Sequence, residues 1–572
     1  MSVVGVPASR QPIGGCYTSF VLQTQRDFLV DAIQRGGVAD FSTEGAPSAD
    51  LQAGEVRTLV IELCRSGVVD AAGVRISGAT FIGGFDLAGV ALDRPISIDS
   101  SVFDVPINLS GFAGVSVSIT SSHAPALRAD LLRLERNLDL SHSTFEGRLP
   151  PGMVYRARET TINLDDADIG GNLVMVGATL INPGKLTISG DNLHVRGTFR
   201  LNRGFRSEGT IRLIGARVDR EFGLEGSTLA APGGDALYAN GIVTGGSLLF
   251  NFVGTNPNIP QPTSIVGRVC LAGASVHGQI VANGSTFRNP NGVAIFAEGL
   301  EVRSDLLLYG GCHVEGRINL LRATIGGQVA LNGSRFIAPG ENAVDLGRSK
   351  IGAGFEATGA FAANGTIRLV GSTIGGSLRV CDGASIDAAG KRSTLAATGA
   401  DVSGDIYLNG IKSTGGQIRL RGVRVRGNVE ANDGTILHGD GTFALVLDDA
   451  RIDGQVELGG GLDAIGTLSF RNAHVGGSLT TASGESQAPS SVTAGASGDA
   501  VDLSESVIEG SVRLSGALIA HGSGSTRDTI VGPPRLIGCV RGPAARIDGD
   551  FDLVERRSRR PGTKQYRSAT CR

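Results

Sequence analysis

The feature that most constrains the fold is an internal repeat of close to fifty residues. It is built on a five-residue element with glycine first and apolar residues third and fifth, as in GTIRL (365–369), GSLRV (376–380) and GQVEL (454–458). Alternation with a period of two predicts a short β-strand with one buried face. Elements this short are typical of the rungs of a solenoid.

Three columns of apolar positions keep the same rhythm along the chain. In one column the steps are 49, 58, 49, 49, 51 and 50 residues. Its members are Ile162, Ile211, Val269, Ile318, Ile367, Ile418 and Leu468. The single longer step indicates an insertion, for which the Pro/Asn-rich stretch 254–263 is the candidate.

These columns predict an all-β fold, a right-handed parallel β-helix (β-solenoid) over residues 73–553. We expect about 23 residues per turn and two turns in each repeat of roughly 50 residues. The apolar positions of successive turns should then stack into one continuous core.

One stretch of each repeat is longer and rich in Pro, Gly, Asn and Asp, which is turn chemistry. It recurs at 181–185, 231–235, 288–292, 338–342, 387–391 and 438–442. We expect these loops to line one edge of the solenoid and to contact a partner. The candidate contact residues are Asn182, Lys185, Asn289, Asn291, Glu341, Lys391 and Asp440.

Both ends of the chain differ from the repeat. Residues 1–72 predict a small helical cap, with apolar faces over 20–35 and 56–67 that would cover the first strands. Residues 554–572 are basic, and we expect a disordered tail. An alternative is contact of the tail with phosphates or anionic lipid, through Arg556, Arg557, Arg559 and Arg560.

Composition argues against several classes of function. The chain has 86 glycines, three Met and no Trp, unlike a conventional enzyme core of this length. A net charge of −3 argues against specific nucleic-acid binding. Seven scattered cysteines without a C-x-x-C pair, no signal peptide and no long apolar run predict a cytoplasmic chain without a membrane-spanning helix. The basic tail leaves peripheral membrane contact as an alternative.

No motif for catalysis, cofactor binding or metal binding is found. The glycine-rich windows open no helix of the dinucleotide-binding type, and the histidines are scattered. Cys312 and His313 are adjacent, so their side chains should point to opposite faces of a strand. The acidic pairs 165–166 and 448–449 recur within the repeat, which favours a structural role. We therefore predict no catalytic residue, no cofactor and no metal.

Several segments are similar to a known family. They are DFLVDAIQRGGVADFSTEG (27–45), VRTLVIELCRSG (56–67), VRISGATFIGGFDLAGVAL (74–92), residues 116–147 and the GARVDREFGLEGSTL type (215–229). Together they resemble a bacterial family of pentapeptide-like repeat proteins identified as membrane-associated oxidoreductases. The resemblance covers residues 20–553 and implies a solenoid with N-terminal helices. It also implies a redox activity associated with membranes.

The leading hypothesis is a non-enzymatic binding or scaffold protein. It would present a solenoid face and the row of loops to a macromolecule, with another protein or a second copy of the chain as the expected partner. One alternative is the oxidoreductase activity that the resemblance implies. Another is a self-assembling structural element that joins end to end through its C-terminal coil.

Overall fold

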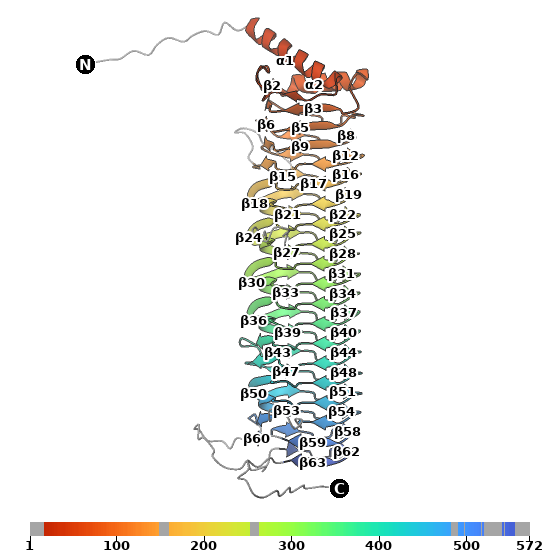
Figure 1. The fold of residues 1–572 in the computed structure, drawn as a ribbon, viewed down its shortest axis with the longest axis vertical. Helices are drawn as coiled ribbons and strands as arrows, with labels where there is room; N and C mark the ends of the chain where they lie inside the picture. Colours follow the sequence, from red (N-terminus) through yellow and green to blue (C-terminus); the bar gives the residue numbers. More distant parts are fainter. Residues whose placement is uncertain are drawn as a thin grey trace, which may run out of the picture. The chain divides into compact units, whose positions relative to one another are not determined.

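The structure, a computed structural model, describes residues 16–147, 160–251, 262–481, 490–496, 498–515, 517–519, 540–542 and 544–554. It contains two compact units, Met1–Gly197 and Thr198–Arg572, which are described separately below. In each unit, short parallel strands stack into three sheets, named A, B and C here (Figure 1). The predicted all-β solenoid with N-terminal helices is confirmed.

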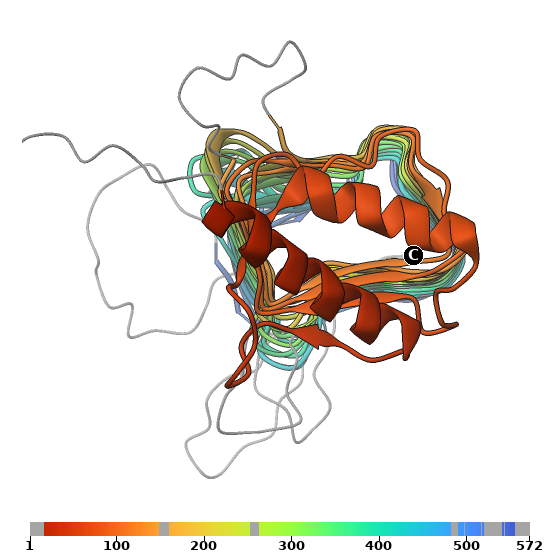
Figure 2. The same cartoon turned by 90° about the horizontal axis from the view of Figure 1, so that it is seen from above.

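The N-terminal unit begins with two helices, α1 (Cys16–Gln34) and α2 (Ala53–Ser66), which lie across its first coils (Figure 2). Helix α2 ends at Ser66 because Gly67 adopts a left-handed φ of 72° and its N–H bonds to the Cys64 carbonyl. The buried face of α2 contains Ala53, Val56, Leu59, Val60, Ile61 and Cys64. The helices therefore cover the edge of the first strands, as predicted.

The expected cap also contributes strands, since β1 pairs with β3 and β2 pairs with β4. Sheet A of this unit contains β1 (Ala39–Asp40), β3 (Val74–Ser77), β5 (Ile96–Asp99), β9 (Val117–Thr120), β13 (Leu138–Asp139) and β17 (Leu173–Val174). Sheet B contains β2 (Asp50–Gln52), β4 (Thr80–Ile82), β6 (Val102–Phe103), β7 (Ile107–Asn108), β10 (His123–Ala124), β11 (Leu127–Arg128), β14 (Thr144–Phe145), β15 (Thr160–Asn163) and β18 (Thr179–Ser189). Sheet C contains β8 (Ala113–Gly114), β12 (Arg133–Leu134), β16 (Asp168–Ile169) and β19 (His194–Val195).

The C-terminal unit repeats this plan over more coils. Its sheet A runs from β20 (Phe199–Arg200) through β23 (Phe222–Gly223) and β26 (Leu248–Leu249) to β63 (Phe551–Val554). Sheet C runs from β22 (Arg217–Val218) to β62 (Arg546–Ile547) and includes β37 (Lys350–Ile351) and β40 (Thr373–Ile374). In sheet B, long strands β24 (Thr228–Tyr238), β30 (Thr286–Phe296), β36 (Arg335–Asp345) and β50 (Ile436–Val446) are separated by shorter ones, among them β27 (Ser264–Cys270), β33 (His313–Asn319) and β39 (Ala362–Arg368).

Strand register gives the length of each coil. Phe199 pairs with Phe222, which pairs with Leu248, so successive coils take 23 and 26 residues. The predicted turn of about 23 residues is thus found in alternate coils, and the coil that carries the loop is longer. Ile318 and Ile367 both pair with Val344, which confirms that residues one repeat apart belong to the same stack.

Apolar side chains of the three sheets fill the interior of each unit. Ile318, Ile367 and Val344 are fully buried. The rings of Phe199 and Phe222 stack with centroids 4.8 Å apart. Each such side chain stabilises the fold by roughly 1.5–3 kcal/mol relative to exposure. Every coil therefore depends on its two neighbours for most of its stability.

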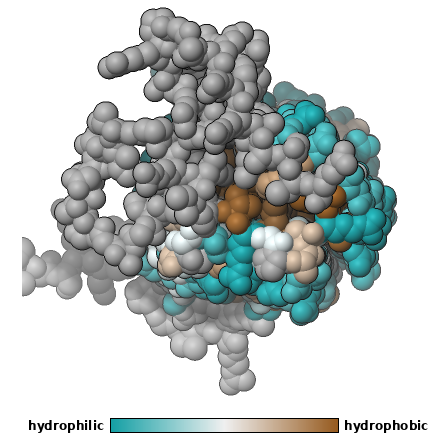
Figure 3. All heavy atoms as spheres, turned by 90° about the horizontal axis from the view of Figure 1, so that it is seen from below, coloured by the Kyte–Doolittle hydropathy of each residue, from teal (hydrophilic) through white to brown (hydrophobic). Residues whose placement is uncertain are grey.

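The last described coil differs from those before it. Strands β61 (Val540–Arg541), β62 and β63 each pair with one strand only among the described residues. Their inward side chains Val540, Ile547 and Phe551 are half-buried, whereas the equivalent residues one coil earlier are buried. Apolar side chains are visible in the view of this end (Figure 3). The four tail arginines, Arg556, Arg557, Arg559 and Arg560, lie outside the described residues.

Candidate functional site

The row of loops is the first candidate. In the C-terminal unit, register places the loops in alternate coils at equivalent positions of sheet B, since Ala230 pairs with Val266 and Val266 pairs with Arg288. Strands lie about 4.8 Å apart, so neighbouring loops recur at about 10 Å. In the N-terminal unit, β18 carries a loop of the same kind at 181–185.

The loops are tight turns fixed by local chemistry. Gly184 and Gly340 have φ values of 75° and 72° after a proline, as expected for the third residue of a type II turn, and Asn291 takes the same role with φ 61°. The Nδ2 groups of Asn182 and Asn289 donate to the carbonyls of Leu186 and Val293, at 2.9 and 2.8 Å. These two asparagines close the turn.

The loops also pack against the following coil. Gly365 in β39 has a φ of 123°, and a Cβ there would lie 2.6 Å from the Ala338 carbonyl oxygen and 2.8 Å from that of Glu341. Gly267 makes the same close approach to the loop 231–235. Gly365 and Gly267 therefore each lie beneath a loop of the preceding coil, where a side chain would not fit.

The predicted contact residues of the loops differ in accessibility. Lys185, Asn291 and Glu341 are exposed, Asn289 and Lys391 are half-buried, and Asn182 is buried. Asp440 is exposed as a residue, but only 21% of its side chain is. Asp440 accepts hydrogen bonds from the N–H groups of Thr442 and Phe443. The Glu341 carboxylate lies 3.6 Å from Arg317. Much of the polar chemistry of these loops thus stabilises the loops themselves.

The acidic pairs bind neighbouring coils. Asp448 accepts from Ser469 and Arg471. Asp449 accepts hydrogen bonds from Asn472 and Arg421. These bonds lower the pKa of its carboxyl below the usual value, and the bond from Asn472 has the larger effect. Asp165 and Asp166 likewise accept from Ser189 and Asn192. Each pair joins one coil to the next, which supports the structural role that the repeat predicts.

Cys312 and His313 point to opposite faces of the strand region, as their adjacency predicts. Cys312 is fully buried, and burial raises the pKa of its thiol to about 12. The Nε2 atom of His313 lies 3.2 Å from a Glu315 carboxylate oxygen on the outer face. Within the described ranges, no three His, Cys, Asp or Glu side chains are grouped so as to hold a metal ion.

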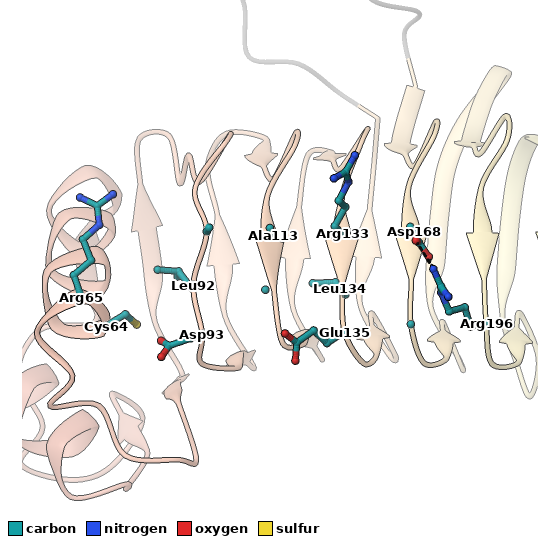
Figure 4. Close-up of a pocket in the computed structure, with 13 residues that line it drawn as sticks. Cys64, Arg65, Leu92, Asp93, Ala113, Arg133, Leu134, Glu135, Asp168 and Arg196 are labelled. Carbon is teal, nitrogen blue, oxygen red and sulfur yellow. Dashed lines mark hydrogen bonds and ion pairs between the residues drawn. The ribbon is translucent and has the colours of Figure 1, made fainter.

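A second candidate site, which the sequence did not predict, is a groove in the N-terminal unit (Figure 4). It has a volume of about 870 Å³ and lies between the C-terminal turn of α2 and the outer face of sheet C. Its lining residues are Cys64, Arg65, Ala91, Leu92, Asp93, Ala113, Gly114, Arg133, Leu134, Glu135, Asp168, Gly170 and Arg196.

The floor of the groove is formed by residues with short side chains. Ala91 pairs with Ala113, and Ala113 pairs with Arg133, so two alanines occupy outward positions beside the helix. Gly114 pairs with the inward residue Leu134, and a Cβ there would lie in the core, 2.6 Å from the ring of the buried Phe112. The hollow beside the helix therefore comes from the short side chains of the two alanines.

Charged side chains form the walls. Arg196 makes two bonds to the Asp168 carboxylate, at 2.8 and 3.2 Å, and this contact is the main cause that lowers the pKa of Asp168. Within the described residues, Arg65, Arg133 and Glu135 have no ion pair. Burial is the main cause that raises the pKa of the Cys64 thiol, and the negative charge of Asp93 adds to it. The raised pKa disfavours a reactive thiolate.

The fold and these surfaces define the class: a parallel β-solenoid built of two-coil repeats, an architecture that fits pentapeptide-repeat-like proteins. No protein-family model, no curated protein and no solved structure matches the chain. In the part of the chain that the structure describes, neither helix has the length and apolar character needed to cross a bilayer.

Proposed function

We propose that the protein is a non-enzymatic binding or scaffold protein that holds a protein partner on the outer face of its solenoid. The groove beside α2 is the observation that carries this proposal. It offers about 870 Å³ of space lined by Arg65, Arg133 and Glu135, which make no ion pair within the described residues. Unpaired charges on a fixed surface favour recognition of a complementary surface.

Site-specific photo-crosslinking in the source cells tests this proposal. A crosslinking amino acid replaces Ala113 on the groove floor, and the matched control replaces Thr373, an exposed residue of sheet C in the C-terminal unit. We expect a discrete adduct from position 113 alone, lost when Arg133→Glu is added. Equal labelling at both positions, or none at position 113, would argue against a partner in the groove.

We propose self-association as a second candidate, supported by the last described coil. Its strands have one neighbour each among the described residues, and Val540, Ile547 and Phe551 are half-buried. Strand edges of this kind pair readily with another chain. Sedimentation velocity of the full chain should show larger species at higher concentration, reduced by Phe551→Glu. A single monomeric species at all concentrations contradicts this candidate.

We also propose a narrower relationship, to the pentapeptide-like repeat proteins identified as membrane-associated oxidoreductases, and a cytoplasmic location. The likeness of residues 27–45, 74–92 and 116–147 to that family supports the relationship. The seven scattered cysteines support the location. The activity in the family's name is the enzymatic alternative to binding. Flavin or nicotinamide released from the purified protein, with turnover of a redox substrate, would favour this alternative.

A further inference from the structure

We propose that the groove beside α2 receives an extended polypeptide segment in which acidic and basic side chains alternate; this deepens the proposed function and rests on it. In Figure 4, Arg65 and Arg133 extend toward one side of the groove. Asp93 and Glu135 lie on the opposite side. Register places Asp168 beside Arg133, and Arg196 in the column of Glu135, and at this far end the two bind each other. Between α2 and β12 the two sides of the groove therefore carry opposite charge, with a floor of small side chains between them.

Strand geometry explains this separation. Arg133 and Glu135 are two residues apart, at β12 and just after it, and both side chains are exposed while Leu134 between them is buried. Residues i and i+2 of a strand lie about 6.6 Å apart on one face. One coil thus supplies a cation to one side of the groove and an anion to the other.

An extended chain that crosses the strands fits this pattern. Its successive side chains point to opposite sides. Acidic residues at alternate positions would then face Arg65 and Arg133, and the basic residues between them would face Asp93 and Glu135. A segment with this alternation satisfies both sides at once.

Segments of a single charge fit poorly. The groove is lined by three arginines, Arg65, Arg133 and Arg196, and by three carboxylates, Asp93, Glu135 and Asp168. Asp168 is paired with Arg196 and Asp93 with Arg94. A polyanion such as a nucleic acid would still lie against Glu135, and a polycation against Arg65 and Arg133. Juxtaposed like charges are costly at an interface. The balance of the lining charges therefore selects a partner with both signs.

The groove is also preformed, because the backbone beneath it is held by the neighbouring coils. Strands β12 and β16 beneath it each pair with a strand on both sides, and at Gly170 a Cβ would lie 2.3 Å from the Glu135 carbonyl oxygen. The Asp168–Arg196 pair is already formed at one end. A rigid surface loses little conformational entropy on binding, which favours even a short segment.

Two synthetic peptides of identical composition and net charge give the test. One alternates Glu and Lys strictly, and the other places all Glu before all Lys. Binding of each labelled peptide to the full chain is measured by fluorescence anisotropy at low salt. We expect the alternating peptide to bind at least about tenfold more tightly, and its binding to weaken as salt is added.

Charge reversal at one wall completes the test. Arg133→Glu should weaken the binding of the alternating peptide by about tenfold or more. Lys350→Glu, at an exposed position of sheet C outside the groove, should leave this affinity unchanged. Circular dichroism of both variants verifies folding. Equal affinity for the two peptides, or no effect of Arg133→Glu, overturns the inference.

The two proposals can fail separately. If the peptides show no preference but the crosslink at position 113 still forms and still depends on Arg133, the groove has a partner and the alternating pattern is wrong. If the crosslink also fails, the proposed binding function fails with it.

Discussion

Gly365 shows how a single residue can hold a loop in place. Its φ of 123° is unfavourable for other residues, and a Cβ would meet two carbonyl oxygens of the loop 338–342. Gly340 at the tip of that loop has a left-handed φ of 72°, but a Cβ there would come no nearer to its surroundings than 4.0 Å, from the Ala389 carbonyl oxygen. The two positions therefore separate backbone strain from steric conflict.

We expect Gly365→Ala to lower the free energy of unfolding by about 2–4 kcal/mol, since strain and overpacking add. Gly340→Ala is the matched control and should cost about 1 kcal/mol, because only the backbone conformation opposes it. Thermal unfolding followed by circular dichroism measures both. Equal losses in the two variants would mean that the loop does not rest on Gly365.

Carboxylates bound between coils should make the stability depend on pH. The pKa values of Asp168 and Asp449 are lowered, first by hydrogen bonds from Arg196 and Asn472 respectively. A group with a lowered folded pKa stabilises the fold above its ordinary pKa, and that contribution is lost as the pH falls through the folded pKa. We expect the thermal midpoint to fall between about pH 5 and pH 3. Replacing both by Asn should flatten the profile; an unchanged midpoint down to acid pH would be inconsistent with this account.

At the scale of the element, each strand of sheet B depends on its buried column. Ile367 in β39 is fully buried between Val344 and Leu395. We expect Ile367→Ala to cost about 2–5 kcal/mol through the cavity it leaves. The exposed outward residue Lys350 in β37 is the control, and Lys350→Ala should stay within about 0.5 kcal/mol. Similar midpoints for the two variants in thermal unfolding would contradict the column as the source of stability.

The strands of sheets A and B could be predicted because their apolar residues alternate and recur at the same step. Sheet C left a weaker signal. Its strand β22 buries Val218 two residues after the small Ala216, whereas β20 of sheet A buries Phe199 two residues before Leu201. The groove left no recognisable signal in the sequence. Ala91 and Ala113 are ordinary residues in the sequence, and their importance comes from the placement of α2 beside them. Contact between a helix and a distant coil is not part of a periodic pattern.

For the molecule as a whole, the N-terminal helices and the strands β1 and β2 protect the first coils of their unit. A chain that begins at residue 73 loses the partners of β3 and β4 and the buried face of α2. We expect it to associate or aggregate through the exposed strand edges. Light scattering against a chain that begins at residue 16 measures the effect. Equal scattering from both chains would show that the cap is dispensable.

The alternation of coils with and without a loop has a consequence for how such a chain can change its length. Removing residues 318–366 would put Ile367 in the place of Ile318, its equivalent one repeat earlier, so a recombination event of that size creates no new kind of junction. Removing only a coil without a loop would instead bring two loop-bearing coils together, without a glycine such as Gly365 between them. Insertions and deletions in the gene should therefore add or remove two coils at a time. Related chains of different length should then differ by an even number of coils.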